Sequence, residues 1–353
     1  MPVTVVVGGQ FGSEGKGKVA YEFAKMQSAS IAVRVGGANS GHTVVEPDGT
    51  KHVFRHLPSA SIIPGMTSVI GPGAYIDADL LVSEIAKYQI SPTQLKIHPN
   101  AVLIDEQHRE LEITDGLRGK IGSTGSGTGG AVLGRISRSV AVSFVESDPR
   151  LIQYISDTQS FLRQKLDAGE RIVVEGTQGY GLSLLHSHYY PYVTSRDTTA
   201  SAFLSEAGLS PIDVDDVVMV IRAFPIRVAG NSGPLPKEIS WEKLTKISGS
   251  ERPLHELTTV TQLTRRVAEF DASIVREAIS VNCPTKIVMN HLDYVDRTYR
   301  AKHAMTSKLL SFISNVEADI ERNLDFVGVD PSSLLQADKL VHGNRSVKPN
   351  AVE

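Results

Sequence analysis

The chain has 353 residues, enough for one large α/β domain or two modest ones. Lysine and arginine number 36 against 39 aspartates and glutamates, so the formal net charge of −3 excludes a bulk positive field for binding nucleic acid but permits a pocket with local cations. The single cysteine, Cys283, excludes a disulfide framework and a cysteine-based zinc site, which predicts a cytoplasmic protein. No apolar run reaches about 18 residues, so no membrane partner is expected.

Short β-branched runs separated by helical periodicity predict a mostly parallel sheet covered by helices. The first run, residues 3–7, does not alternate, which is typical of a strand buried on both faces; a glycine-rich turn and a helix over residues 19–26 follow it. A longer stretch of helical periodicity covers residues 148–168. Further buried strands are expected at residues 31–34, 68–70, 96–97, 171–175, 217–222 and 286–290. This alternation is the pattern of an α/β fold.

Residues 12–18, Gly-Ser-Glu-Gly-Lys-Gly-Lys, lie between the first predicted strand and the first predicted helix. Glycines let backbone N–H groups converge on an anion, the helix N-terminus adds partial positive charge, and Lys16 and Lys18 are within reach. The pattern favours phosphate binding over an ordinary turn with solvated lysines. The spacing resembles a Walker loop, but Val19 replaces the Ser or Thr that would bind magnesium, so a standard Walker site is not expected.

Residues 36–43, Gly-Gly-Ala-Asn-Ser-Gly-His-Thr, follow the second predicted strand and therefore lie at the same edge of the sheet as the phosphate loop. Asn39 and His42 could polarise or protonate a bound ligand, because imidazole is well matched to proton transfer near neutral pH. A single histidine in a turn is more often a surface residue. The neighbouring phosphate loop favours the functional interpretation.

Residues 116–134 contain eight glycines in nineteen positions, which predicts either an interdomain linker or a mobile binding loop. Hydroxyl groups at Ser123 and Thr124 lie among these glycines, and Arg135 and Arg138 follow them. Backbone donors, hydroxyls and a guanidinium together suit a monophosphate.

Four other segments carry polar groups but are weaker signals individually. Residues 175–179, Glu-Gly-Thr-Gln-Gly, follow a predicted strand, and residues 190–195, Tyr-Pro-Tyr-Val-Thr-Ser, come soon after; both could be structural turns. Residues 258–266, Thr-Thr-Val-Thr-Gln-Leu-Thr-Arg-Arg, could bind a carboxylate or could simply begin a charged helix. Residues 290–293, Asn-His-Leu-Asp, end a strand in a form that loosely resembles base-reading motifs.

Taken in chain order, five of these segments resemble blocks of the adenylosuccinate synthetase family. The blocks are residues 12–18, 39–43, 122–125, 175–179 and 190–195, and the resemblance extends from Val3 to about Asp293. It implies one domain over residues 1–353 with the P-loop-like fold of that family. It also implies a C–N-forming ligase, in which a nucleoside triphosphate phosphorylates the 6-oxygen of a purine monophosphate and the aspartate amine then displaces the phosphate.

The resemblance also implies roles for individual residues. His42, Ser13 and Gln178 would act at the reacting atoms, and Gly41 and Ser13 would bind Mg²⁺. Further implied contacts are Gly12, Glu14, Gly15, Lys16, Gly17, Lys18 and Thr43 for the triphosphate, Ser13, Asn39, Ser123, Thr124, Arg138, Gln178 and Thr194 for the purine monophosphate, Thr258, Thr259, Val260, Thr261, Arg265 and Arg266 for aspartate, and Asn290, Asp293 and Gly343 for the base of the triphosphate. Arg138 would reach the phosphate from a partner subunit, which makes a homodimer part of the site.

The most informative departure from the family pattern is Ser13. Family enzymes that act on inosinate (IMP) have an aspartate here, which takes the purine N1 proton and touches magnesium. A serine hydroxyl cannot serve as that base, but it is shorter and leaves space for the 2-amino group that guanine has and hypoxanthine lacks. This combination resembles the bacteriophage 2-aminoadenylosuccinate synthetases, which act on 2'-deoxyguanylate (dGMP) in the host cytoplasm to supply 2-aminoadenine for DNA.

Two further departures concern the other substrates. The arginine-rich aspartate loop of the family is thinned here, with Arg265 and Arg266 as the candidates for binding aspartate. The lysine of the guanine-reading Lys-Leu-Asp is His291, which favours ATP over GTP as the phosphoryl donor. The alternatives are a conventional synthetase using IMP and GTP, or a nucleotide-binding regulator that has lost catalysis.

Overall fold

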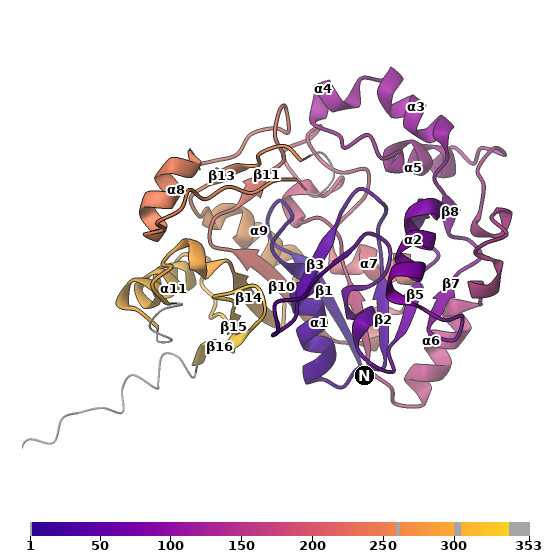
Figure 1. Ribbon diagram of the computed structural model, residues 1–353, viewed down its shortest axis with the longest axis horizontal. Coiled ribbons are helices and arrows are strands. Elements are labelled where there is room, and N and C mark those ends of the chain that lie inside the picture. Colours follow the sequence, from indigo (N-terminus) through magenta and orange to yellow (C-terminus); the bar gives the residue numbers. More distant parts are fainter. Residues whose placement is uncertain (1, 259–261, 300–304, 339–353) are drawn as a thin grey trace, which may run out of the picture.

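A nine-stranded sheet runs through the centre of the molecule in the computed structural model, which describes residues 2–258, 262–299 and 305–338 (Figure 1). The strand order is β16-β15-β14-β10-β1-β9-β2-β5-β7. All neighbouring pairs are parallel except β15 and β16. The strands are β1 (Val3–Gly8), β2 (Ile31–Arg34), β5 (Thr67–Ile70), β7 (Leu95–Ile97), β9 (Ile172–Glu175), β10 (Val214–Arg222), β14 (Lys286–Asn290), β15 (Phe326–Val327) and β16 (Leu335–Gln336). The predicted mostly parallel α/β fold is confirmed.

Three smaller sheets accompany the central one. The hairpin of β3 (His42–Val45) and β4 (Lys51–Phe54) follows β2. The others pair β6 (Tyr75–Ile76) with β8 (Val102–Leu103), and β11 (Ile226–Arg227) with β13 (Arg266–Ala268) and β12 (Glu238–Ile239). The hairpin therefore begins at His42, within one of the segments expected to bind a ligand.

Most of the helices begin at a residue whose side chain caps the first turn, whereas α1 (Lys16–Met26), α4 (Leu117–Ile121) and α5 (Thr128–Ile136) begin after a glycine. The other helices are α2 (Ala78–Tyr88), α3 (Glu106–Thr114), α6 (Thr158–Asp167), α7 (Ala200–Ala207), α8 (Trp241–Ser248), α9 (Ala272–Asn282) and α11 (Ser307–Ile320). Helix α1 starts three residues earlier than predicted because Gly15, with φ of 89°, turns the chain directly into it. None of the helices in these described ranges is long and apolar enough to cross a membrane.

Two expectations for the middle of the chain were wrong. Residues 148–168 are not one helix: the backbone N–H of Ser156 bonds Ile97 of β7, and only then does Asp157 cap α6 by accepting from the Ser160 N–H. The glycine-rich residues 116–134 are neither a linker nor one loop, because they contain α4 and most of α5.

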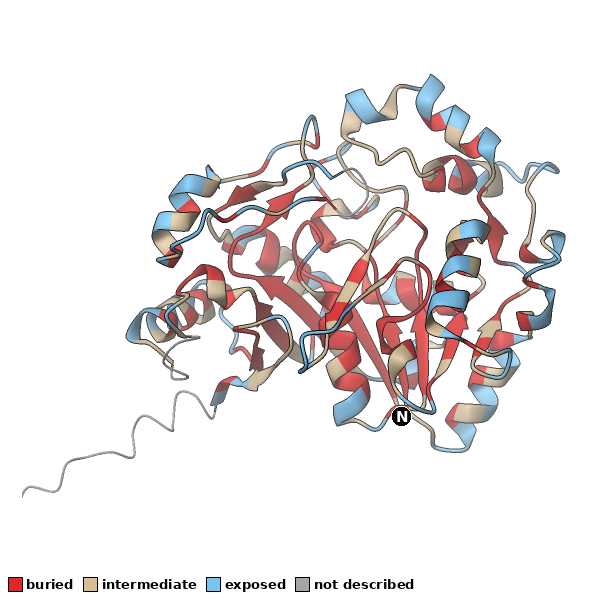
Figure 2. Ribbon diagram, in the orientation of Figure 1, coloured by how far each residue is buried: buried red, intermediate tan, exposed pale blue. Residues whose placement is uncertain are grey.

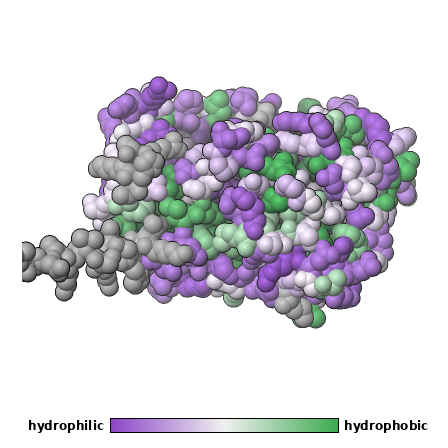
Figure 3. Space-filling view, turned by 60° about the horizontal axis from the view of Figure 1, so that its bottom comes forward, coloured by the Kyte–Doolittle hydropathy of each residue, from purple (hydrophilic) through white to green (hydrophobic). Residues whose placement is uncertain are grey.

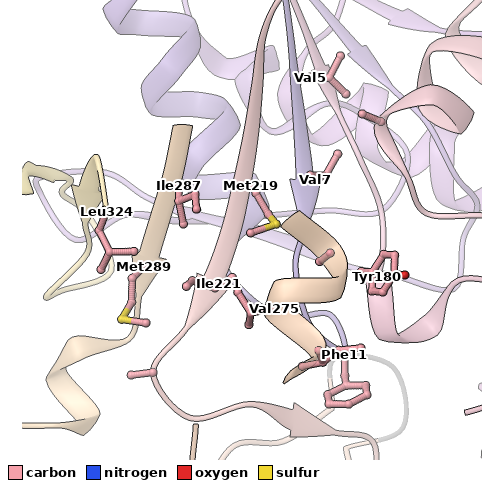
Figure 4. Packing of buried hydrophobic residues seen from close by; sticks show 14 of the residues in the cluster. Val5, Val7, Phe11, Tyr180, Met219, Ile221, Val275, Ile287, Met289 and Leu324 are labelled. Carbon is pink, nitrogen blue, oxygen red and sulfur yellow. The ribbon is translucent and has the colours of Figure 1, made fainter. Parts of the chain in front are cut away.

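Apolar side chains cover both faces of the central sheet. Val5 and Val7 of β1 contribute to the larger core cluster, together with Met219 and Ile221 of β10 and Val275 of α9 (Figure 4). A second cluster on the other face joins α1 to the sheet. The strands are accordingly buried along most of their length (Figure 2). The surface shows mostly hydrophilic side chains with scattered apolar ones on the face seen in Figure 3.

Candidate functional site

A cavity of about 940 Å³ opens at the carboxyl edge of the central sheet. Its wall includes segments that follow four parallel strands: the phosphate loop after β1, residues 39–43 after β2, Gln178 after β9 and His291 after β14. Ligands of open α/β sheets bind at this edge because the loops that leave the strands converge there. The structure thus brings together segments that lie far apart in the sequence.

Most predicted site residues line this cavity. Those that do are Gly12, Ser13, Gly15, Lys16, Gly17, Lys18, Asn39, Gly41, His42, Thr43, Ser123, Thr124, Gln178, Thr194, Thr258, Arg265, Asn290 and Asp293. Glu14, Arg138 and Arg266 do not line it, and Thr259, Val260, Thr261 and Gly343 lie outside the described residues. Arg138 is exposed in the turn after α5, so its reach into a partner's site stays a prediction.

The buried carboxylate of Glu14 stabilises the phosphate loop, residues 12–18, through hydrogen bonds to its backbone and to Lys16. Its side chain is fully buried, and its Oε1 accepts hydrogen bonds from the backbone N–H groups of Gln10, at 3.2 Å, and Gly12, at 2.7 Å. Its Oε2 accepts from Lys16 Nζ at 2.7 Å. A carboxylate repels phosphate, so the predicted contact between Glu14 and the triphosphate is better understood as support: Glu14 shapes the loop and positions Lys16.

Lys18 connects the first helix to the far end of the chain. Its Nζ donates to the backbone carbonyl of Asp330 at 2.7 Å and lies 3.4 Å from Asn290 Oδ1. Burial lowers the Lys18 pKa to about 8, with carboxylates of Asp330 and Asp293 opposing the shift. The negative charge of a bound triphosphate would raise the Lys18 pKa again and stabilise its ammonium form.

Asn290 fits between two glycine positions. Its Nδ2 donates to the Glu14 carbonyl at 2.9 Å. A Cβ at Gly15 would lie 2.8 Å from that Nδ2, and one at Gly328 would lie 2.1 Å from Oδ1. Asn290 therefore fixes the phosphate loop against the segment after β15, in addition to lining the cavity.

His42 is held by a buried ion pair that sequence reasoning missed. Arg34 and Glu175 are the last residues of β2 and β9 and lie opposite each other in the parallel pairing. Glu175 hydrogen-bonds His42 Nδ1. Arg34 Nη1 lies 2.6 Å from His42 Nδ1, 3.1 Å from His42 Nε2 and 3.2 Å from Glu175 Oε1. Ser59 completes the arrangement by donating its backbone N–H to Glu175 at 2.6 Å. A charged residue ending each of two apolar strands was the available sequence signal.

The electrostatics of this group leave His42 neutral at pH 7. Burial, and then the charge of Arg34, lower the His42 pKa to about 4, although Glu175 opposes the shift. Burial works against ionisation of Glu175, but His42 and Arg34 outweigh it and lower the Glu175 pKa to about 2. The Glu175 carboxylate favours the tautomer with the proton on Nδ1, in which Nε2 is the basic nitrogen and lies 3.1 Å from Arg34 Nη1.

The glycine-rich segment forms the wall at α5. Ser123 and Thr124 line the cavity, and so does Glu112 of α3, which is buried. Glu112 accepts hydrogen bonds from the Gly129 N–H at 2.7 Å and from Ser123 Oγ at 3.3 Å. Sequence reasoning did not identify Glu112, which satisfies the N-terminus of α5 and orients the Ser123 hydroxyl.

The two arginines proposed for aspartate differ in their surroundings. Arg266 forms an ion pair with Glu238, with Nε 2.8 Å from Oε1, and donates to the Gly233 carbonyl at 2.7 Å. Arg265 lines the cavity, donates from Nε to the Leu257 carbonyl at 3.1 Å and contacts Ser13 Oγ through Nη1. Arg265 is therefore the better candidate for binding a carboxylate.

A fully buried arginine supports this side of the cavity. Arg222, at the end of β10, donates from Nη1 to the Ser13 carbonyl at 3.0 Å and forms an ion pair with Glu256. Tyr294 also donates its hydroxyl to Glu256, at 2.9 Å. Burial opposes ionisation of Glu256, but Arg222 is the main charge that outweighs it and lowers the pKa of Glu256 to about 2.

The end of the cavity near β14 contains residues that the sequence had suggested for a base, and others that it had not. Asn290 and Asp293 line it, with Arg297 3.9 Å from the Asp293 carboxylate. Asp330 and Pro331, in the turn between β15 and β16, also line it. These two residues were missed because nothing in the local pattern distinguishes them from an ordinary turn.

The protein oxygens at the cavity fit a magnesium ion that is held mainly by the phosphates of a bound triphosphate. No group of three or more His, Cys, Asp or Glu suited to a metal occurs in residues 2–258, 262–299 or 305–338. Mg²⁺ commonly takes one or two protein oxygens and completes its shell with water and substrate phosphates. Gly41 lies beside the phosphate loop and can offer its carbonyl. The guanidinium on Ser13 Oγ disfavours that hydroxyl as a ligand, because two cations would share it.

Comparison with known sequences gives one family. The adenylosuccinate synthetase family profile matches residues 5–143 and 139–309. The adenylosuccinate synthetase of Archaeoglobus fulgidus is 33% identical over 336 residues, which is 94% of this chain and 96% of the relative. That of Pyrococcus horikoshii is 36% identical over 305 residues, covering 84% of this chain and 86% of the relative.

Two solved structures have similar folds. A structure of the cyanophage S-2L succinoaminodeoxyadenylate synthetase (PurZ), bound to dGMP and to dATP as an energy donor, has a TM-score of 0.81 at 30% identity and covers 97% of both chains. A fully ligated adenylosuccinate synthetase from Plasmodium falciparum has a TM-score of 0.82 at 20% identity, covering 95% of this chain and 100% of the other. The second likeness concerns the fold alone.

Proposed function

The chain belongs to the adenylosuccinate synthetase family of C–N-forming ligases, and we propose that it joins L-aspartate to carbon 6 of dGMP. The reaction is driven by ATP hydrolysis and gives 2-amino-2'-deoxy-N6-succinyladenylate, a precursor of 2-aminoadenine for DNA. We propose that it acts as a bacteriophage enzyme in the host cytoplasm. The active form would be a homodimer of single-domain subunits in which Arg138 reaches the partner's site.

Ser13 is the observation that carries this proposal. It lies in the cavity wall, directly after Gly12 in the phosphate loop. It presents a short uncharged side chain where the family resemblance implies a carboxylate in enzymes that act on IMP. The space left by the shorter side chain suits an exocyclic 2-amino group, which distinguishes guanine from hypoxanthine. The similarity to a cyanophage synthetase solved with dGMP supports the same choice.

The first step would transfer the γ-phosphoryl group of ATP to the purine 6-oxygen, with ADP as the leaving group and the purine N1 proton released to water. Lys16, Lys18 and the backbone N–H groups of the phosphate loop would hold the triphosphate, and His42 would stabilise the transferred group. The aspartate amine then bonds to carbon 6, and the carbon–oxygen bond breaks as phosphate leaves. Phosphorylation makes this possible because it converts a poor leaving group into a good one.

Magnesium enters this scheme as a partner of the triphosphate. Bound Mg²⁺ would supply positive charge at the phosphate oxygens. The Gly41 carbonyl is the protein ligand we propose for it. Lys16 and His42 line the same cavity and would orient the same phosphates.

The direct test is turnover of dGMP and IMP side by side. Phosphate release would be measured with each nucleotide at saturating aspartate, with ATP and with GTP as donors. We expect kcat/KM to be higher for dGMP, and higher with ATP than with GTP. Faster conversion of IMP would refute the guanylate assignment while leaving the family assignment intact.

A conventional reaction with IMP and GTP is the second candidate. It is favoured by the names of the relatives, since the synthetases of Archaeoglobus fulgidus and Pyrococcus horikoshii are called adenylosuccinate synthetases. In that case Ser13 would be a tolerated variation. Replacing Ser13 by aspartate would then leave the preference between the two nucleotides unchanged.

A further inference from the structure

The Ser13 hydroxyl contacts a cation of the neighbouring loop as well as the cavity. Its Oγ accepts a hydrogen bond from Arg265 Nη1, while its backbone carbonyl accepts from Arg222 Nη1 at 3.0 Å. We infer that Ser13 is a positioning residue for the aspartate substrate: its neutral oxygen orients Arg265 and leaves the charge of that arginine free for an aspartate carboxylate. The inference rests on the proposed function, since it takes aspartate as the substrate, and on Arg265 as the cavity arginine that binds its carboxylate.

The charges around Ser13 are arranged so that Arg265 keeps its positive charge available. Glu256 is the nearby carboxylate, but it pairs with Arg222 and accepts a hydrogen bond from Tyr294. The side-chain hydrogen bonds of Arg265 go to the Leu257 carbonyl and the Ser13 hydroxyl, which are neutral acceptors. Within the described ranges, no carboxylate oxygen lies within 4.0 Å of the Arg265 guanidinium.

An unpaired guanidinium in partly buried surroundings is poised for an anion. Burial lowers the Arg265 pKa, and the nearby charge of Arg222 acts in the same direction against the opposing effect of Glu256. A ligand carboxylate would replace lost hydration and form charge-assisted hydrogen bonds. A carboxylate side chain at position 13 would instead form an internal ion pair with Arg265.

An ion pair between a carboxylate at position 13 and Arg265 would compete with the aspartate substrate, and the other residues of the 258–266 loop offer little to replace Arg265. Arg266 is directed to Glu238 on β12, and Leu263 lines the cavity with an apolar side chain. Among the described residues of this loop, Arg265 is thus the arginine that lines the cavity. The neutral serine at position 13 therefore matters for this loop: Arg265 is its guanidinium at the cavity, and a neutral partner leaves the charge of that guanidinium available.

Two substitutions at position 13 separate charge from size. Ser13→Asp introduces a carboxylate, and Ser13→Asn introduces an uncharged group of the same shape. We expect Ser13→Asp to raise the KM for aspartate by about 10-fold or more, because one charge-assisted interaction with the substrate is lost. Ser13→Asn should keep it within about 3-fold. Both variants fill the space for the 2-amino group, so the ratio of dGMP to IMP turnover reports on the proposed function separately.

A rescue variant distinguishes lost positioning from general damage. Adding Leu263→Arg to Ser13→Asp supplies a second guanidinium at the cavity wall, and the KM for aspartate should fall again. For variants with slow turnover, calorimetry of the enzyme with a non-hydrolysable ATP analogue and whichever of dGMP and IMP the variant binds gives the aspartate Kd. An unchanged aspartate affinity in Ser13→Asp, or equal losses in Ser13→Asp and Ser13→Asn, would overturn the inference, whatever the nucleotide preference.

Discussion

Glu175→Gln is the substitution that tests most directly how the fold prepares His42. The change keeps the shape of the side chain and removes its negative charge. Arg34 then remains fully enclosed without its ion-pair partner, and the amide can donate to His42 Nδ1 where the carboxylate accepts. The imidazole would be driven toward the other tautomer, with its proton on Nε2.

The expected losses are large enough to measure. Removing one partner of a buried ion pair costs about 3–5 kcal/mol. Unfolding entropy of about 2.1 cal/mol/K per residue gives about 0.74 kcal/mol/K for a chain of 353 residues. A loss of about 3 kcal/mol therefore lowers Tm by about 4 °C. The wrong tautomer should reduce kcat by about 10-fold or more, with a smaller effect on KM.

Thermal unfolding and phosphate release, measured with whichever of dGMP and IMP turns over faster, test both numbers. Ser59→Ala is the matched control, because it removes one neutral donor to the same carboxylate, from 2.8 Å, and leaves the charges in place. It should lower the stability by about 1 kcal/mol and keep kcat nearly normal. If Glu175→Gln retains kcat within about 3-fold and an unaltered pH profile, Glu175 does not prepare His42.

Three other outcomes follow from the site. His42→Ala should lower kcat by about 100-fold or more with little change in Tm, and a near-normal rate would remove His42 from the mechanism. Lys18→Met should raise the KM for ATP by about 10-fold or more, since a charge-assisted phosphate contact is lost; Lys25→Met, exposed on the same helix, should not. The free energy of unfolding should fall in acid. Residue 42 binds a proton near pH 6.5 in the unfolded chain but only near pH 4 in the folded protein, so protons favour unfolding between these values. Glu175 loses its stabilising charge between pH 4.5 and about 2. Urea unfolding at several pH values, with Glu175→Gln lacking the lower window, checks this.

The strands could be predicted because burial on both faces leaves a continuous apolar run that needs no context. The exception at β10 is instructive: Asp215 and Asp216 interrupt the apolar run, yet the strand begins at Val214, because Asp216 pairs with Lys286 and Gln27. Helices α4 and α5 were missed because their sequences are rich in glycine. Their glycines lower helix propensity, but a Cβ at Gly130 would lie 2.5 Å from the His108 carbonyl, so close packing against α3 requires glycine there.

The site could be predicted where a single loop carries its own signal, as at residues 12–18. It could not be predicted where two distant segments create the chemistry. Arg34 and Glu175 are 141 positions apart, and the contact of Lys18 with Asp330 spans 312. The role of Glu14 was misjudged because sequence shows that a side chain belongs to a loop, not whether it faces the ligand or the interior.

The register of two neighbouring strands has a consequence for how this enzyme can change. Arg34 and Glu175 face each other only because β2 and β9 are aligned residue for residue, so the orientation of the imidazole is inherited from backbone pairing. A one-residue slip would turn each side chain to the opposite face and dismantle the arrangement that holds His42. Correct pairing of β2 with β9 is therefore needed both for folding and for orienting His42. Substitutions in the loops can change substrate preference more freely than substitutions that shift this pairing.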